Sequence, residues 1–358
     1  MSPERARLLA WIPVSRTCGG NTAKALVCCP WTLIWPEMKI AVVGCGAVGS
    51  YYGGMLARLG ESVHFLLRSD YDVVKRDGVH IASIAGDFHV RPLAAREPEE
   101  IGIADLVLIG LKSTANAEFR RLLPPLAGPQ TAVLTLQNGL GNEEQLEELF
   151  SPAQILGGLC FVCLNRVRPG FIRHIAHGQI VMGEFSGPSR PRTHQIAAMF
   201  ERSGVPCKVT EDLARAHWEK LVWNVPFNGL GVAGTAGYEA VIAGRLQPGR
   251  SLGPVLTTDA ILGDSRWRAL ARALMLEVIG AARAQGFAVP DSAAEEQMQR
   301  TENMGPYKAS TLLDFEKGLP LELSSLFLEP LRRGAASGAK VERWARLCSV
   351  LEQLANRN

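Results

Sequence analysis

The segment Lys39–Gly60, KIAVVGCGAVGSYYGGMLARLG, decides the fold of the first half of the chain. It opens with the continuous apolar run KIAVVG, which predicts a buried β-strand. A glycine-rich turn follows and leads directly into an amphipathic helical pattern, which ends at Gly60. A strand, a tight turn and a helix in this order predict the start of a parallel α/β unit.

The glycine-rich turn has the spacing G-x-G-x-x-G, and its six residues are Gly44, Cys45, Gly46, Ala47, Val48 and Gly49. The first glycine permits a tight turn, the second lets a pyrophosphate approach the backbone, and the third lets the helix pack on the strand. The N-terminus of the following helix favours a bound anion. Because the motif stands between a strand and a helix, these six residues are predicted to bind a dinucleotide.

Further buried-strand patterns continue this domain and alternate with helical patterns. They are SVHFLLR (62–68), ADLVLIGLK (104–112), TAVLTLQNG (131–139), GQIVMGEF (178–185) and PCKVTED (206–212). Continuous apolar strands that alternate with helices indicate a parallel sheet covered on both faces. Residues 38–211 are therefore predicted to form an α/β, Rossmann-type dinucleotide-binding domain.

Strand signals fade after this point, and apolar patterns such as RWRALARALMLEVIGAARAQG (266–286) have helical spacing. Residues 212–358 are predicted to form a mostly α-helical domain that binds the substrate and carries out catalysis. Within this domain, residues 234–255 are rich in Gly and Pro and are predicted to be a loop-like insert. Residues 1–37 show no sustained period and are predicted to be a poorly ordered N-terminal extension without a function.

The end of the second predicted strand bears on the choice of cofactor. NAD sites usually place an Asp or Glu there to bind the ribose hydroxyls. This chain has Arg68 at that position, and a guanidinium suits the 2′-phosphate of NADP(H). In the alternative interpretation, Arg68 is an ordinary surface arginine and Asp70 binds the ribose. We expect NADP(H) as the cofactor.

Two further polar residues directly follow buried strands. Lys112 stands after the third strand and Asn138 after the fourth, in IGLKST and TLQNGLG. Ligands of open parallel sheets bind at the carboxyl ends of the strands, so both side chains are expected at the nicotinamide end of the cofactor. Asn138 has an equally good alternative explanation, because Asn-Gly is a common turn pair.

The stretch HWEKLVWNVPFNGL (217–230) places three polar residues on one face of a mostly apolar helix. Lys220, Asn224 and Asn228 are four residues apart, and such positions lie one above the other on a helix. Buried ammonium and amide groups are costly unless they have partners, so this face is expected to line a binding site. An isolated lysine on such a helix would more often extend its amine to solvent.

The composition limits the classes of protein and partner. A chain of 358 residues accommodates two domains, and a net charge of +3 is too small to indicate nucleic acid or membrane as a partner. The 8 cysteines include one isolated C-x-x-C, Cys160 and Cys163, without the further ligands of a zinc site. Reduced cysteines in a cytoplasmic protein without a bound metal are expected.

Several of these motifs together resemble the ketopantoate reductase (2-dehydropantoate 2-reductase) family. The resemblance runs from about Met38 to near the C-terminus, with an interruption at 234–255. It rests on the glycine motif, LK (111–112), QNGLG (137–141), WEKLVWNVPFN (218–228) and KASTLLDFEKGLPLELSSLF (308–327).

The resemblance implies that Lys220 is the catalytic lysine, which would supply charge and a proton to a ketone that receives a hydride. The residues implied to bind the substrate are Asn224, Asn228, Ser310 and Glu322, and Asp314 is implied to be structural. Three positions depart from the family pattern, namely Thr311, Leu321 and Ser324.

The expected function is the NADPH-dependent reduction of ketopantoate to pantoate, in pantothenate and coenzyme A biosynthesis. One alternative is a related reductase of another 2-oxo acid or ketone, and a second is an NADP-binding sensor without turnover. The expected partner is a small-molecule 2-oxo acid, with no nucleic acid and no membrane. A homodimer is compatible with the sequence, which leaves the oligomeric state open.

Overall fold

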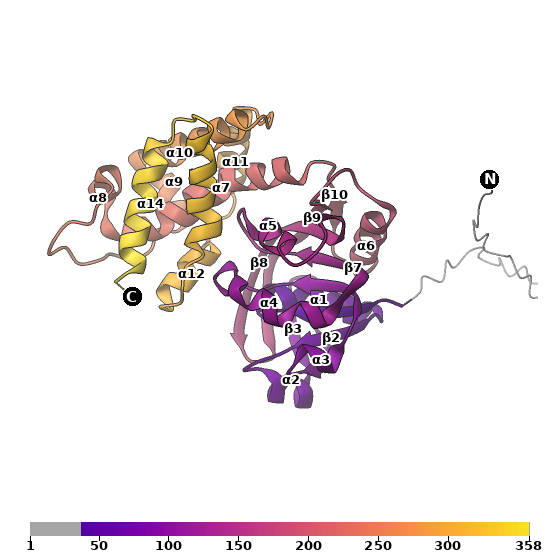
Figure 1. The fold of residues 1–358 in the computed structure, drawn as a ribbon. Coiled ribbons are helices and arrows are strands. Elements are labelled where there is room, and N and C mark those ends of the chain that lie inside the picture. Colours follow the sequence, from indigo (N-terminus) through magenta and orange to yellow (C-terminus); the bar gives the residue numbers. More distant parts are fainter. Residues whose placement is uncertain (1–36, 358) are drawn as a thin grey trace, which may run out of the picture. The chain divides into compact units, whose positions relative to one another are not determined.

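The computed structural model describes residues 37–357. The expectations for residues 1–36 lie outside this range. Residues from Glu37 onward pack as one unit, in which a sheet with its covering helices comes first and a group of helices follows (Figure 1). None of the helices described here has the length and apolar character needed to cross a bilayer.

The strands between residues 39 and 209 form one sheet, whose path is β4-β3-β9-β8-β7-β6-β1-β2-β5, with β10 paired to β9. Their bounds are β1 Lys39–Val43, β2 Ser62–Leu66, β3 Val79–Ser83, β4 Phe88–Val90, β5 Leu93–Ala95, β6 Ala104–Ile109, β7 Ala127–Thr135, β8 Ile155–Arg168, β9 Phe171–Glu184 and β10 Cys207–Val209. The pairs β3–β4 and β8–β9 are antiparallel, and the others are parallel. The predicted parallel α/β domain is thus present, with an added long hairpin, β8–β9.

Helices cover both faces of the sheet, and β1 shows why its sequence is apolar throughout. Ile40 and Val42 pack into the core under α1 and α6, whereas Ala41 and Val43 pack into the core on the other face. A strand buried on both sides must be a continuous apolar run. The helices of this half are α1 Ala47–Leu59, α2 Tyr71–Asp77, α3 Pro98–Ile101, α4 Phe119–Leu122, α5 Asn142–Glu147 and α6 Pro191–Arg202.

Strand β1 lies between β2 and β6, and all three are parallel. The chain leaves β1 toward β2 on one side and later adds β6 on the other, so the carboxyl end of β1 is a topological switch point. Short 3-10 helices occupy some of the connections, namely η1 Ser113–Glu118, η2 Pro124–Leu126 and η3 Pro152–Gln154. The glycine turn, Lys112 and η1 therefore meet at one edge of the sheet.

The helical half begins with α7, Leu213–Ala233, whose first turn is capped by the side chain of Asp212. Helix α7 packs against α10 Ser265–Ala284 and buries Trp218 and Phe227 in a single core with the neighbouring helices. These neighbours are α8 Tyr238–Ala243, α9 Thr258–Gly263, α11 Ser292–Glu302, α12 Ser310–Glu316, the π-helical turn η5 Ser324–Leu328, α13 Glu329–Ala336 and α14 Glu342–Ala355. Because apolar side chains surround α7, its few polar side chains are exceptions within this core.

The segment 234–255 is more ordered than its composition suggests. It contains the 3-10 turn η4 Gly234–Ala236 and the helix α8, which buries Ala240 and Val241 near α14. The prediction of a loop-like insert is wrong for this part, because Gly237 and Gly244 lie on either side of a short helix, α8. Residues 244–257 contain no regular element.

Candidate active site

Lys220 on α7 lies against the loop that follows β7. Its Nζ donates a hydrogen bond to Oδ1 of Asn138 over 2.7 Å, and the ammonium also lies 5.5 Å from the centre of the Phe161 ring. Residues from α7, β8 and the β7 loop therefore meet at this amine. The two predicted residues, Lys220 and Asn138, are brought together although 82 positions separate them.

The electrostatic setting of Lys220 favours release of its proton. Burial lowers the pKa of Lys220 from its usual value, while nearby Cys160 and Glu322 act in the opposite direction. Desolvation disfavours the charged form of an amine, so this ammonium is a stronger acid than a lysine in water. An amine of this kind can donate a proton to an oxygen that gains negative charge.

The two asparagines of the α7 face differ in their environment. Asn224 is 8% exposed, and its amide makes no hydrogen bond to any residue between 37 and 357. Asn228 is 2% exposed, and its Oδ1 accepts a hydrogen bond from the backbone N–H of Thr311 over 3.3 Å. The Asn228 amide thus helps to hold the start of α12, whereas the Asn224 amide is available for a ligand.

Ser310 is the first residue of α12 and is exposed. Glu322 lies after α12 and reaches the sheet half, where its Oε1 accepts hydrogen bonds from Ser113 N (2.8 Å) and Ser113 Oγ (3.1 Å). Burial raises the pKa of Glu322 from its usual value, and the two bonds from Ser113 act in the opposite direction. The carboxylate of Glu322 is therefore held at the boundary between the sheet half (residues 37–211) and the helical half (residues 212–357), which is called the seam below.

Lys112 forms an ion pair with Asp314 of α12, with Nζ and Oδ1 2.5 Å apart. Asp314 is 13% exposed and Lys112 is 45% exposed, so the pair lies at the border of the seam. The structure thus places Lys112 at the carboxyl end of β6, as predicted, and in contact with the helical half. Its ammonium is neutralised by Asp314 in this arrangement.

The glycine turn leaves space on one side and is closely packed on the other. Gly44 has φ +92°, and a Cβ at Gly44 would collide with the backbone of Leu111, while one at Gly49 would collide with the carbonyl oxygen of Gly44. A Cβ at Gly46 would meet nothing within 4 Å. Gly46 is also the N-cap of α1 and offers no capping side chain, so the first N–H groups of α1 receive no hydrogen bond from a cap. The turn therefore fits a phosphate group.

The two candidates for recognising the ribose have different partners. Both carboxylate oxygens of Asp70 accept hydrogen bonds from the guanidinium of Arg166, with Nε at 2.9 Å from Oδ2, and Ser69 donates a further one. Arg68 is exposed and, within the described residues, has no ion pair or hydrogen bond. Asp70 is thus already engaged, and the guanidinium of Arg68 is free to meet an anion.

Sequence reasoning missed three residues that the structure adds to this region. Ser113 and Ser325 form a hydrogen-bonded chain to Glu322, in which Ser325 Oγ donates to Ser113 Oγ over 2.7 Å. The Phe161 ring is 41% exposed beside Lys220. Ser113 could have been noticed because it directly follows Lys112 at a strand end, but nothing local marks Ser325 or Phe161.

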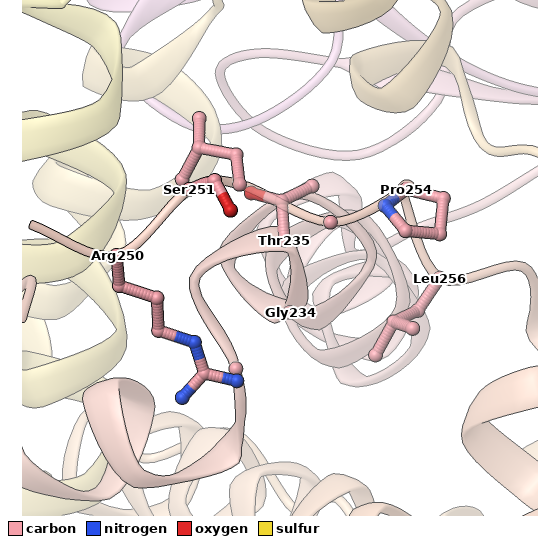
Figure 2. Close-up of a pocket in the computed structure, with 9 residues that line it drawn as sticks. Gly234, Thr235, Arg250, Ser251, Pro254 and Leu256 are labelled. Atoms are coloured by element: carbon pink, nitrogen blue, oxygen red, sulfur yellow. The ribbon is translucent and has the colours of Figure 1, made fainter.

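Away from this region, a pocket of about 330 Å³ lies at the far end of α7 (Figure 2). Its lining includes Gly234, Thr235 and residues 250–254. Gly234 follows Lys220 by fourteen residues, so this pocket begins roughly 21 Å farther along the helix axis. It is separate from the candidate active site. No group of metal-ligating side chains was found among residues 37–357.

Comparison with known proteins gives a consistent result. The sequence model described as "Ketopantoate reductase PanE/ApbA" matches residues 40–187, and the one for the C terminal part of that family matches residues 255–355. A 2-dehydropantoate 2-reductase of Nostoc sp. is 37% identical, over 90% of this chain and 97% of the relative. An uncharacterised oxidoreductase of Bacillus subtilis, YkpB, is 33% identical, over 83% and 93%.

Solved structures agree with these matches. The crystal structure of 2-dehydropantoate 2-reductase from Geobacter metallireducens GS-15 has a TM-score of 0.80 and 44% identity, and covers 88% of this chain and 99% of that one. D-mandelate dehydrogenase, at 17% identity and a TM-score of 0.77, shares the fold. The chain therefore belongs to the ketopantoate reductase PanE/ApbA family.

Proposed function

We propose that the protein is an NADPH-dependent 2-dehydropantoate 2-reductase, which reduces the ketone of ketopantoate to the alcohol of pantoate in pantothenate and coenzyme A biosynthesis. The observation that carries the proposal is the contact between Lys220 Nζ and Asn138 Oδ1 over 2.7 Å. This contact brings a desolvated amine from the helical half to the strand end beside the dinucleotide motif. Lys220 lies between the two segments matched by the family models, so its role rests on this geometry.

NADPH supplies the hydride when it is bound. The proposed binding residues begin with the glycine turn, Gly44 to Gly49, whose open side at Gly46 and uncapped helix N-terminus suit a pyrophosphate. The free guanidinium of Arg68 suits the 2′-phosphate, and the engagement of Asp70 by Arg166 argues against Asp70 as a ribose ligand. Lys112 and Asn138 would lie toward the nicotinamide end, at the carboxyl ends of β6 and β7.

Lys220 is proposed as the general acid. As the carbonyl carbon accepts a hydride, its oxygen becomes negative, and the Lys220 ammonium stabilises this charge and transfers a proton to it. The resulting neutral amine is the form that burial favours. Asn138 holds the amine in place through its amide oxygen, which cannot take the proton at ordinary pH.

Four residues of the helical half are proposed to bind the oxo acid. Glu322 accepts a hydrogen bond from the substrate hydroxyl, and the unpaired amide of Asn224 meets the polar groups of the acid. Asn228 contributes both to the pocket and to the position of α12, whose exposed first residue, Ser310, donates to the carboxylate.

A second candidate within the same reaction class is the reduction of another 2-oxo acid. It is favoured by Phe161, whose exposed ring lies beside Lys220, and by the departures from the family pattern at Thr311 and Leu321. A sensor without turnover would need the glycine turn and Arg68 to bind the nucleotide. It would not need the Lys220 amine and the Glu322 carboxylate at the seam. We also propose a cytoplasmic location, which the free thiols of the described cysteines support.

The test is the loss of NADPH absorbance with ketopantoate and with a panel of linear, branched and aromatic 2-oxo acids. Ketopantoate should show the highest kcat/KM of the panel. A different preferred acid would support the second candidate, and an absence of turnover with every acid would contradict both.

A further inference from the structure

Glu322 belongs to the helical half, but its hydrogen-bond partners belong to the sheet half. Ser113, the first residue of η1, donates both its backbone N–H and its hydroxyl to the same oxygen, Glu322 Oε1. The hydroxyl of Ser325, which is 5% exposed, donates in turn to Ser113 Oγ. A directed chain of hydrogen bonds thus runs from Ser325 through Ser113 to the carboxylate.

We propose that Ser113, supported by Ser325, is a positioning residue that holds Glu322 ready for the substrate. Oε1 takes both bonds from Ser113, and Oε2 makes no hydrogen bond to a described residue. One carboxylate oxygen is therefore tethered, and the other is left to accept a hydrogen bond from the substrate hydroxyl. This inference rests on the proposed function.

Fixing the carboxylate in advance should favour binding. A free glutamate side chain loses rotamer freedom when a ligand orders it, and that loss weakens affinity. With two bonds at 2.8 and 3.1 Å on Oε1, the loss has already occurred in the free enzyme. The bonds also come from donors that stabilise the ionised form of a carboxyl group.

The charges around Glu322 show why the serine hydroxyl matters. Lys112 lowers the pKa of Glu322, but its ammonium is paired with Asp314, which acts in the opposite direction. Lys220 is a second cation near the carboxylate, and it is itself desolvated. Burial raises the pKa of Glu322, and the two hydrogen bonds from Ser113 are the largest local contributions that lower it.

The position of Ser113 and Ser325 makes this tether depend on the meeting of the two halves. Ser113 directly follows Lys112 at the end of β6. The backbone carbonyl of Ser325 accepts a hydrogen bond from Leu140 N over 2.9 Å, and a Cβ at Gly139 would collide with that carbonyl. Ser325 is therefore held by the β7 loop while its hydroxyl supports Ser113.

The experiment compares Ser113→Ala, Ser113→Thr and Ser325→Ala with the wild type, with Ser324→Ala as the matched control. Ser324 is exposed next to Ser325 and makes no side-chain hydrogen bond to a described residue. Two measurements are made on the NADPH-loaded enzyme. The first is kcat and KM for the best 2-oxo acid of the panel, and the second is the 13C titration of the Glu322 carboxyl, assigned with Glu322→Gln.

Ser113→Ala should raise KM for the oxo acid roughly tenfold with kcat nearly unchanged, because a hydrogen bond to a charged group is lost. The pKa of Glu322 should rise, so the acidic limb of kcat/KM moves to higher pH. Ser113→Thr should restore both values, Ser325→Ala should raise KM about threefold, and Ser324→Ala should behave as wild type.

An unchanged KM and an unchanged Glu322 titration in Ser113→Ala would overturn the inference. If that variant is damaged in its fold, shown by a lower Tm and a higher KM for NADPH, then Ser325→Ala decides in its place, and an unchanged KM and an unchanged Glu322 titration in Ser325→Ala would overturn the inference. The carboxyl titration needs no substrate. A wild type without turnover would therefore contradict the proposed function, while the titration would still support or overturn the role of Ser113.

Discussion

The amine of Lys220 on α7 lies 2.7 Å from the amide oxygen of Asn138, in the loop that follows β7 of the sheet half. This single hydrogen bond connects two regions that the sequence marks for different purposes, a helix with aligned polar groups and a strand end beside a nucleotide motif. It also means that the orientation of the proposed acid is set from the half of the enzyme that would hold the cofactor.

Replacement of Lys220 by Ala should lower kcat roughly 10²–10⁴-fold, because general acid catalysis contributes about that factor. Binding of NADPH, measured by fluorescence titration, should stay close to the wild-type value, since the glycine turn and Arg68 are unchanged. Lys208→Ala, which removes an exposed lysine from β10, serves as the control and should be fully active. A Lys220→Ala enzyme with a near-normal kcat would exclude Lys220 as the acid.

The pH dependence of kcat should show the lowered pKa of Lys220. The group donates only while it is protonated, so kcat falls as the pH rises through its pKa, and burial moves that fall below the usual value of 10.5. Asn138→Asp places a carboxylate beside the amine and should raise this pKa, which shifts the alkaline limb to higher pH. An alkaline limb at the same pH in both enzymes would contradict this account.

Arg68→Ala should raise KM for NADPH by at least about tenfold, because a charge-assisted hydrogen bond to the 2′-phosphate is lost. KM for NADH, which lacks that phosphate, should change little. The control is Arg58→Ala, since Arg58 is an exposed arginine of α1 that contacts the Phe88 ring instead. Equal effects on both nucleotides would place the preference for NADPH elsewhere.

Two glycines of the turn should respond differently to Ala. At Gly49 the added methyl group would collide with the Gly44 carbonyl, so Gly49→Ala should lower stability by about 1–3 kcal/mol, measured by urea unfolding. At Gly46 the methyl group would enter open space, so Gly46→Ala should keep the wild-type Tm but bind NADPH more weakly. If Gly46→Ala binds the nucleotide normally, the pyrophosphate does not approach the backbone at that point.

The parts of the site that could be predicted are those whose information is local in the chain. The strand, turn and helix around Gly44 follow from adjacent residues, and the aligned face of α7 follows from helical geometry alone. The central parallel strands β1, β6 and β7 were predicted for the same reason, since each shows its burial on both faces as an apolar run.

Other features depend on contacts between distant segments and have no local pattern. Ser113 and Glu322 are 209 positions apart, and neither residue type nor spacing indicates that they touch. Asn228 was predicted to face a ligand, but its Oδ1 also accepts from Thr311, which only the packing of α12 on α7 brings near. Helix α8 was not predicted, because the glycines on both sides of it give the segment the composition of a loop.

The close approach of Gly139 to the Ser325 carbonyl has a consequence for engineering. A hybrid enzyme that joined this nucleotide-binding half to the helical half of a relative would need a glycine at that point and a matching backbone opposite it. Substrate range should therefore be easier to alter by single replacements around Phe161 than by exchange of whole modules.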